Sequence, residues 1–99
     1  MKINIQSVHF DADRKLLDFI ESKLNKLYSV YDSIVASDVT LKLDKAANGE
    51  NKIAEIRLSV PGTDLYAMRQ CRTFEEATDL SVDALKIQIE KHKAKLQNA

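Results

Sequence analysis

The spacing of apolar residues divides this chain of 99 residues into six segments of regular structure. Four segments alternate apolar and polar residues, which is the pattern of strands that bury one face. Two longer segments repeat apolar residues every three or four positions, which predicts helices with one buried stripe. The predicted strands span 2–8, 39–43, 54–60 and, with a less regular pattern, 64–72, and the predicted helices span 13–31 and 73–97. The order of elements is βαβββα.

Short polar signals mark where helices begin and where strands turn. Asp13 or Asp11 is expected to cap the first helix, and the sequence Thr73-Phe-Glu-Glu76 is typical of a capping box for the second. Asn48-Gly49 and Pro61-Gly62 predict turns between strands. Because these are the only glycines and the only proline, the chain has no glycine-rich loop that could cradle a nucleotide phosphate.

The connections between these segments predict an α+β fold with a four-stranded mixed sheet. Short turns make the second, third and fourth strands antiparallel, whereas the helix between the first two strands makes that pair parallel. Each helix then runs back along the sheet, so the two helices lie parallel on one face with their C-termini at the same end. The other face of the sheet stays open, and residues 1–99 form a single domain.

Composition excludes several classes of protein. Lys plus Arg equal Asp plus Glu at 15 each, so the net charge provides no general attraction to polyanions. The longest apolar run, from Leu65 to Met68, is too short for a spanning helix or a signal peptide. The lone Cys71 allows no internal disulfide and no cysteine-built zinc site. We therefore expect a cytoplasmic protein.

Acidic residues gather at the start of each predicted helix, and lysines gather toward its end. The first helix has Asp11, Asp13, Asp18 and Glu21 before Lys23 and Lys26, and the second has Glu75, Glu76, Asp79 and Asp83 before Lys86, Lys91, Lys93 and Lys95, with Glu90 among them. Parallel helices would place both basic ends at one pole of the molecule. Two interpretations stay open: the charges complement the helix dipoles, at about 0.3–1 kcal/mol each, or the lysines bind the phosphates of a polyanion.

Other groups of residues indicate no active site. His9, Asp11 and Asp13 could ligate a metal, but a helix cap beside an unrelated histidine is the simpler interpretation. His92 lies on the apolar stripe of the second helix, as a packed histidine would, and Cys71 has no recognisable base near it in the sequence. The three tyrosines are expected to pack in the core or at its edge: Tyr28, Tyr31 and Tyr66. We expect no metal, no cofactor and no enzymatic activity.

The second predicted helix carries a distinctive series of polar residues: Asp79, Asp83, Gln88 and the run Lys91-His92-Lys93, followed by Lys95-Leu96. In its order and spacing this series resembles the second helix of the ribosome hibernation-promoting factors. That family is also called the ribosome-associated translation inhibitors or sigma-54 modulation proteins. Segment 18–32 is similar to the first helix of the family, and Thr40–Lys45 to its second strand. The resemblance is to the short form of the family and runs essentially from end to end.

This resemblance implies the βαβββα fold, of the double-stranded-RNA-binding-domain type, and a function. A protein of this family is expected to bind the small ribosomal subunit in the channel for messenger RNA and transfer RNA, and so to inhibit translation during starvation or stationary phase. Basic side chains would contact phosphates of ribosomal RNA (rRNA). Five lysines match basic positions of the family: Lys23, Lys26, Lys42, Lys91 and Lys93. Lys86 is expected to contact rRNA as well.

The chain departs from its relatives at several positions. Relatives often carry a basic residue at three positions where this chain does not: Leu17, Ala84 and Ile87. Lys86 is expected to offset the missing charge at Ala84 and Ile87. Glu75 and Glu76 replace a tyrosine and an alanine. Because the chain ends at Ala99 without the dimerisation domain of long members, we expect a monomer, with any pairing of ribosomes left to a separate factor.

An alternative function involves no nucleic acid. The open face of the sheet could make the chain a protein-interaction module that regulates a cytosolic partner, for example the transcription machinery. The two functions differ in their response to salt, because phosphate contacts weaken steeply as ionic strength rises.

Overall fold

The computed structural model describes residues 1–45 and 48–97 of the chain and confirms the predicted order βαβββα. Its elements are β1 (Lys2–Ser7), α1 (Arg14–Val30), β2 (Ala36–Leu43), β3 (Lys52–Val60), β4 (Thr63–Cys71) and α2 (Phe74–Gln97). The strands form one sheet in the order β1-β2-β3-β4. β1 is parallel to β2, and the other two pairs are antiparallel, as the connections predict.

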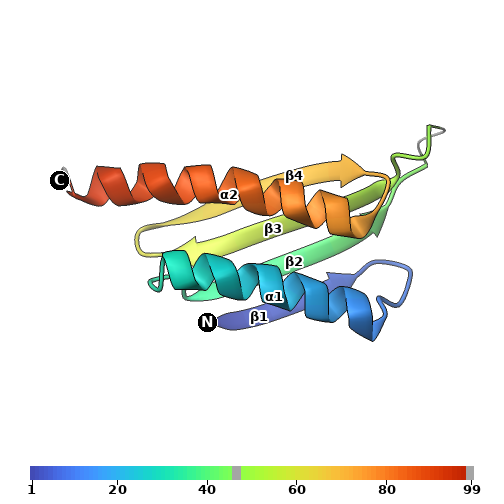
Figure 1. Cartoon of the computed structure of the whole chain (residues 1–99), viewed down its shortest axis with the longest axis horizontal. Coiled ribbons are helices and arrows are strands. Elements are labelled where there is room, and N and C mark those ends of the chain that lie inside the picture. The colour runs from blue at the N-terminus through green and yellow to red at the C-terminus, as the bar shows by residue number, and fades with distance from the viewer. Residues whose placement is uncertain (46–47, 98–99) are drawn as a thin grey trace.

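Both helices lie side by side on one face of the sheet (Figure 1). They run in the same direction, and their C-terminal ends are at the same end of the molecule. The predicted arrangement of helices is therefore confirmed. The opposite face of the sheet carries no helix among the described residues.

β2 begins three residues earlier than the alternation of apolar residues predicts. Ala36, Ser37 and Asp38 continue the ladders with both β1 and β3. Ser37 faces the core and is fully buried, and its hydroxyl lies 3.1 Å from the sulfur of Met1. A small polar residue at an inward position interrupts the apolar pattern without interrupting the backbone hydrogen bonds.

β4 shows why its pattern is the least regular of the four. Ala67 and Cys71 point into the core, whereas Tyr66 and Met68 point outward and are 43% and 44% exposed. Large apolar residues thus occupy outward positions, so side-chain polarity does not alternate although the backbone does.

The ends of helices and strands follow the predicted signals. The Oδ1 atom of Asp13, rather than Asp11, accepts a hydrogen bond of 2.8 Å from the backbone N–H of Leu16. The Thr73 hydroxyl accepts one of 3.1 Å from the N–H of Glu76, which is the first half of the predicted capping box. Gly62 has φ of 87°, as the third residue of a type II turn requires.

The core lies between the helices and the inward face of the sheet. Its fully buried side chains include Ile20, Leu24 and Leu27 from α1, Leu85 and Ile89 from α2, and Leu41, Ile56 and Leu58 from the sheet. The buried Ser81 hydroxyl of α2 reaches the Ala54 carbonyl of β3 at 3.4 Å. None of the described helices is both long and apolar enough to cross a membrane.

We expect the substitution Leu24→Ala to lower the free energy of unfolding by about 2–5 kcal/mol, because it removes buried methyl groups and leaves a cavity. Urea unfolding followed by circular dichroism measures this change. Val35→Ala is the matched control, since Val35 is 65% exposed; a surface substitution of this kind changes stability by less than about 0.5 kcal/mol. Equal effects of the two substitutions would contradict the packing described here.

Candidate nucleic-acid interface

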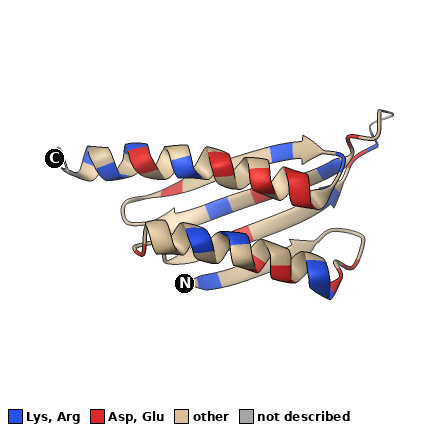
Figure 2. Ribbon diagram, in the orientation of Figure 1, with Lys and Arg blue, Asp and Glu red and all other residues tan. Residues whose placement is uncertain are grey.

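The charges of α2 are separated along its length. Glu75 and Glu76 lie in its first turn and Lys95 in its last. Figure 2 shows red bands in the first half of this helix and mainly blue bands in the second half. The predicted separation of charge is confirmed for α2.

The charges of α1 do not follow the same pattern. Its first turn holds no acidic residue and its last turn no basic one. Asp11 and Asp13 precede the helix, which opens with Arg14 and Lys15, and Arg14 pairs with Asp18 at 3.2 Å. The prediction of an acidic start and a basic end is therefore wrong for α1. Complementing the helix dipole does not account for Lys23 and Lys26, because that effect falls off within the terminal turn.

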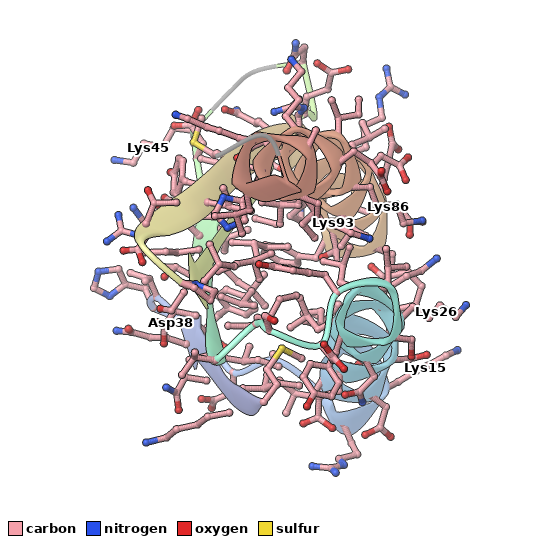
Figure 3. All side chains as sticks on the ribbon, turned by 90° about the vertical axis from the view of Figure 1, so that its left-hand side faces the viewer. Lys15, Lys26, Asp38, Lys45, Lys86 and Lys93 are labelled. Carbon is pink, nitrogen blue, oxygen red and sulfur yellow. The ribbon has the colours of Figure 1, made fainter. Side chains whose placement is uncertain are left out.

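Lysines from both helices point away from the sheet. Figure 3 shows Lys26 of α1 and Lys86 of α2 on the outer side of the helix layer, and Lys93 on the side of α2 that faces α1. Lys86 and Lys93 are two helical turns apart and so share one side of α2. Asp79 lies a further two turns back on that side and contacts Lys23, which places this side of α2 toward α1. We call these four lysines the basic helix surface: Lys23, Lys26, Lys86 and Lys93.

Lys23 is engaged within the protein. Its Nζ atom lies 2.8 Å from Oδ1 of Asp79 and 5.4 Å from the centre of the Phe19 ring. The side chain of Lys23 is 30% exposed and that of Asp79 is 45% exposed. The ammonium of Lys23 therefore already has an anionic partner at the seam between the two helices.

Lys91 is exposed, but it does not belong to the basic helix surface. It lies two positions from Lys93, and such a separation places two side chains on different sides of a helix. Lys95, four positions after Lys91, shares its side. The structure thus divides the lysines of α2 between two sides of the helix.

Lys42 lies apart from the other predicted contacts. It points to the open face of the sheet, near the end of β2 that is remote from the C-terminal ends of the helices. Lys42 therefore lies away from the basic ends of the helices, because the parallel β1–α1–β2 connection places the end of β2 at the opposite end of the molecule. A contact between Lys42 and rRNA stays a prediction, and it is independent of the helix lysines.

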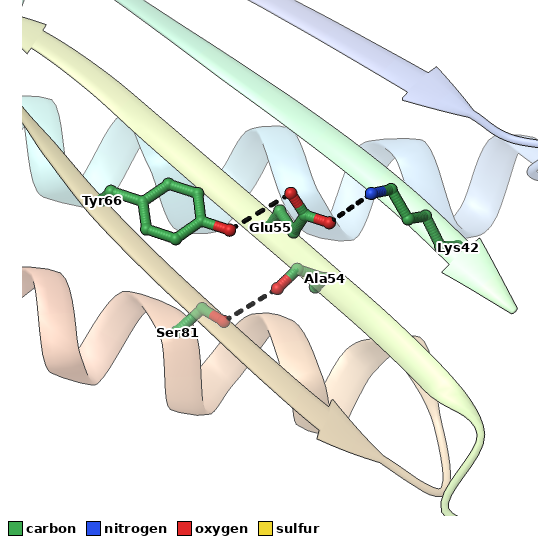
Figure 4. A network of polar contacts seen from close by, with 5 residues as sticks. All are labelled: Lys42, Ala54, Glu55, Tyr66 and Ser81. Atoms are coloured by element: carbon green, nitrogen blue, oxygen red, sulfur yellow. Dashed lines mark hydrogen bonds and ion pairs between the residues drawn. The ribbon is translucent and has the colours of Figure 1, made fainter. Parts of the chain in front are cut away.

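On the open face, Lys42 and Tyr66 both reach Glu55 (Figure 4). The Lys42 ammonium lies 2.7 Å from Oε2 of Glu55, and the Tyr66 hydroxyl donates to Oε1 at 3.1 Å. The hydrogen bond from Lys42 is the largest of the effects that lower the pKa of Glu55. The same bond raises the pKa of Lys42, and partial burial raises the pKa of Tyr66. All three shifts favour the charged Glu55–Lys42 pair with a neutral tyrosine.

The residues at which the sequence departs from the family that it resembles lie in different environments. Leu17 and Ala84 are half-buried, whereas Ile87 is 59% exposed on α2. Gln88 contacts the edge of the sheet: its Nε2 atom donates to the Tyr66 carbonyl at 2.8 Å, and its Oε1 atom accepts from the Tyr66 N–H at 3.3 Å. The side chain of Gln88 thus takes the place of a neighbouring strand at β4.

The other candidates have structural roles. Asp13 caps α1, and His9 is exposed with φ of 65°. Within residues 1–45 and 48–97, no three side chains of His, Cys, Asp or Glu cluster in a way that could hold a metal ion. His92 packs edge-on against Tyr31 at 5.8 Å, which confirms a packed histidine. Cys71 is buried, and burial is the largest of the effects that raise the pKa of its thiol. Its reactive thiolate is therefore disfavoured.

We expect Lys42→Met to raise the pKa of Glu55 toward its ordinary value, because the substitution removes the strongest partner of the carboxylate. Carbon-detected NMR titration measures this pKa, with Lys2→Met at the other end of the sheet as control. Since the folded-state pKa of Glu55 is lowered, its contribution to stability is present above the ordinary pKa of glutamate and is lost as pH falls through the lowered value. An unchanged pKa in Lys42→Met would contradict this account.

Comparison with known proteins supports the same family as the sequence. The chain is 31% identical over 98 residues to the ribosome hibernation promoting factor of Pseudomonas putida, covering 99% of this chain and 92% of that protein. It is 31% identical to the ribosome hibernation promotion factor of Bacillus subtilis, covering 97% of this chain and 50% of that longer protein. The fold matches that of a ribosomal subunit interface protein from Coxiella burnetii, with a TM-score of 0.85 at 23% identity, covering 95% of this chain and 99% of that one. The family model described as "Sigma 54 modulation protein / S30EA ribosomal protein" matches residues 3–97. The chain therefore belongs to the sigma 54 modulation and S30EA ribosomal protein family.

Proposed function

We propose that this protein is a ribosome hibernation factor that binds the small ribosomal subunit and inhibits translation under starvation or in stationary phase. The relatives that match almost the whole chain carry the name ribosome hibernation promoting factor. The observation that carries the proposal here is the basic helix surface, in which lysines from both helices lie together on a molecule of zero net charge.

The proposed mechanism is steric. Lysine contacts to rRNA phosphates orient the domain without reading base sequence. The packed helices and sheet then occupy the channel that messenger RNA and transfer RNA need. In this mechanism the protein holds a position and transforms no substrate, so we propose that it acts by binding rather than by catalysis.

The six proposed rRNA contacts do not contribute equally. Among the described residues, four of them form no salt bridge with a carboxylate: Lys26, Lys86, Lys91 and Lys93. Lys23 and Lys42 are already paired with Asp79 and Glu55. A phosphate would have to compete for these two lysines, so the first four supply most of the binding.

We further propose that the protein acts in the cytoplasm as a monomer and that any pairing of ribosomes depends on a separate factor. The second candidate function, a protein-interaction module, is favoured by one observation. Tyr66 and Met68 are both exposed on the open face of the sheet. Binding that survives high salt and tolerates loss of the helix lysines would indicate that function.

The first expected result is cosedimentation of the protein with the small subunit in sucrose gradients at low salt. Binding should decline steeply between 50 and 200 mM salt, because each phosphate contact adds about 0.7–0.9 to the slope of log K against log salt. Protein that stays at the top of the gradient at low salt would overturn the proposed function. Binding that is independent of salt would favour the open sheet face.

A second expected result concerns Lys91→Glu/Lys93→Glu. This double variant should bind ribosomes at least roughly tenfold more weakly, because two phosphate contacts become repulsive. Its thermal stability should change little, since Lys91 is exposed and neither lysine forms an ion pair within the described residues. The control is Lys15→Glu/Lys45→Glu, which makes the same change in charge near the opposite end of the molecule. Equal ribosome affinity of the two variants would contradict the proposal that Lys91 and Lys93 contact rRNA.

A further inference from the structure

The ion pair between Lys23 and Asp79 crosses the seam between the two helices. The two residues are far apart in the sequence, but their charged atoms lie 2.8 Å apart. Phe19 lies beneath the same ammonium, 5.4 Å from its ring centre. Both charged side chains remain partly open to solvent, so the pair can separate.

Asp79 occupies the position that an RNA phosphate would take on Lys23. A carboxylate and a phosphate oxygen make the same charge-assisted hydrogen bond to an ammonium. Lys26, Lys86 and Lys93 of the same surface have no carboxylate partner among the described residues. One lysine of the basic helix surface is therefore withheld by the protein itself, and the others are available.

We propose that Asp79 is a selectivity residue of the RNA-binding surface, because its carboxylate withholds Lys23 from polyanions that do not displace it. This inference rests on the proposed function. Specificity is a difference between two affinities, and a site can create it by weakening the wrong complex. When rRNA of fixed shape binds the other lysines, it holds a further phosphate close to Lys23 at high local concentration, so that this phosphate can displace Asp79. A flexible single strand does not hold a phosphate in that position.

The test compares two variants that remove one negative charge from the same helix. Asp79→Asn breaks the ion pair, and Asp83→Asn, one turn later, removes an exposed carboxylate that forms no described ion pair. The probe is a fluorescent 12-residue oligouridylate, and its affinity is measured by anisotropy from low to moderate salt. Circular dichroism and thermal melting confirm that both variants are folded.

We expect Asp79→Asn to bind the oligouridylate about three- to tenfold more tightly than the unmodified protein. The reason is that the substitution frees the Lys23 ammonium to contact a phosphate. The salt slope should steepen by about 0.7, which corresponds to one added contact with a single strand. Asp83→Asn should show a smaller gain with an unchanged slope. The preference for ribosomes over the oligouridylate should fall in Asp79→Asn.

Lys23→Met identifies the lysine responsible. In the Asp79→Asn background it should cancel the gain in affinity. Equal gains in Asp79→Asn and Asp83→Asn, a gain that persists without Lys23, or no detectable binding by Asp79→Asn would each overturn the inference. The oligouridylate assay needs no ribosome. Failure of cosedimentation would therefore defeat the proposed function separately from this comparison.

Discussion

The packing of two parallel helices on one face of the sheet is the constraint on which the rest of the structure depends. Leu24 of α1 and Leu85 of α2 are both fully buried. The inward-facing strand residues, such as Ile56, are fully buried as well. Burial of each such side chain contributes about 1.5–3 kcal/mol, so the helices have little freedom to shift across the sheet. This fixed arrangement places lysines from distant parts of the chain on one outer surface.

Local pairing then changes what the charges of that surface can do. The chain has as many acidic as basic residues, and α2 separates them along its length. Lys23 and Lys42 illustrate two ways in which a lysine is removed from the available set. One pairs across the helix seam with Asp79, and the other pairs across strands with Glu55 on the open face. A count of lysines therefore overestimates the charge that a phosphate surface would meet.

One edge of the sheet is covered by a side chain of α2, and the two faces of the sheet differ. α2 protects β4 through the two hydrogen bonds of Gln88 with the Tyr66 backbone. An unpaired strand edge can pair with another chain, so a side-chain amide at this position limits such pairing. The open face instead carries the Lys42–Glu55–Tyr66 network, whose charges are largely balanced. The C-terminal half of α2 is thus basic, whereas the polar network on the sheet face is nearly neutral.

The sequence by itself determined the six elements and their order, because the periods of strand and helix are local properties of the chain. It also determined that Asp11 or Asp13 caps the first helix and that Pro61-Gly62 forms a turn, because these hydrogen bonds and dihedral angles involve near neighbours. Resemblance to the family pointed to the lysines of the site. Only the tertiary structure decided that Ser37 belongs to β2, that Lys42 lies apart from the helix lysines and that Asp79 holds Lys23. These contacts join segments distant in sequence, and their geometry depends on how the elements pack against one another.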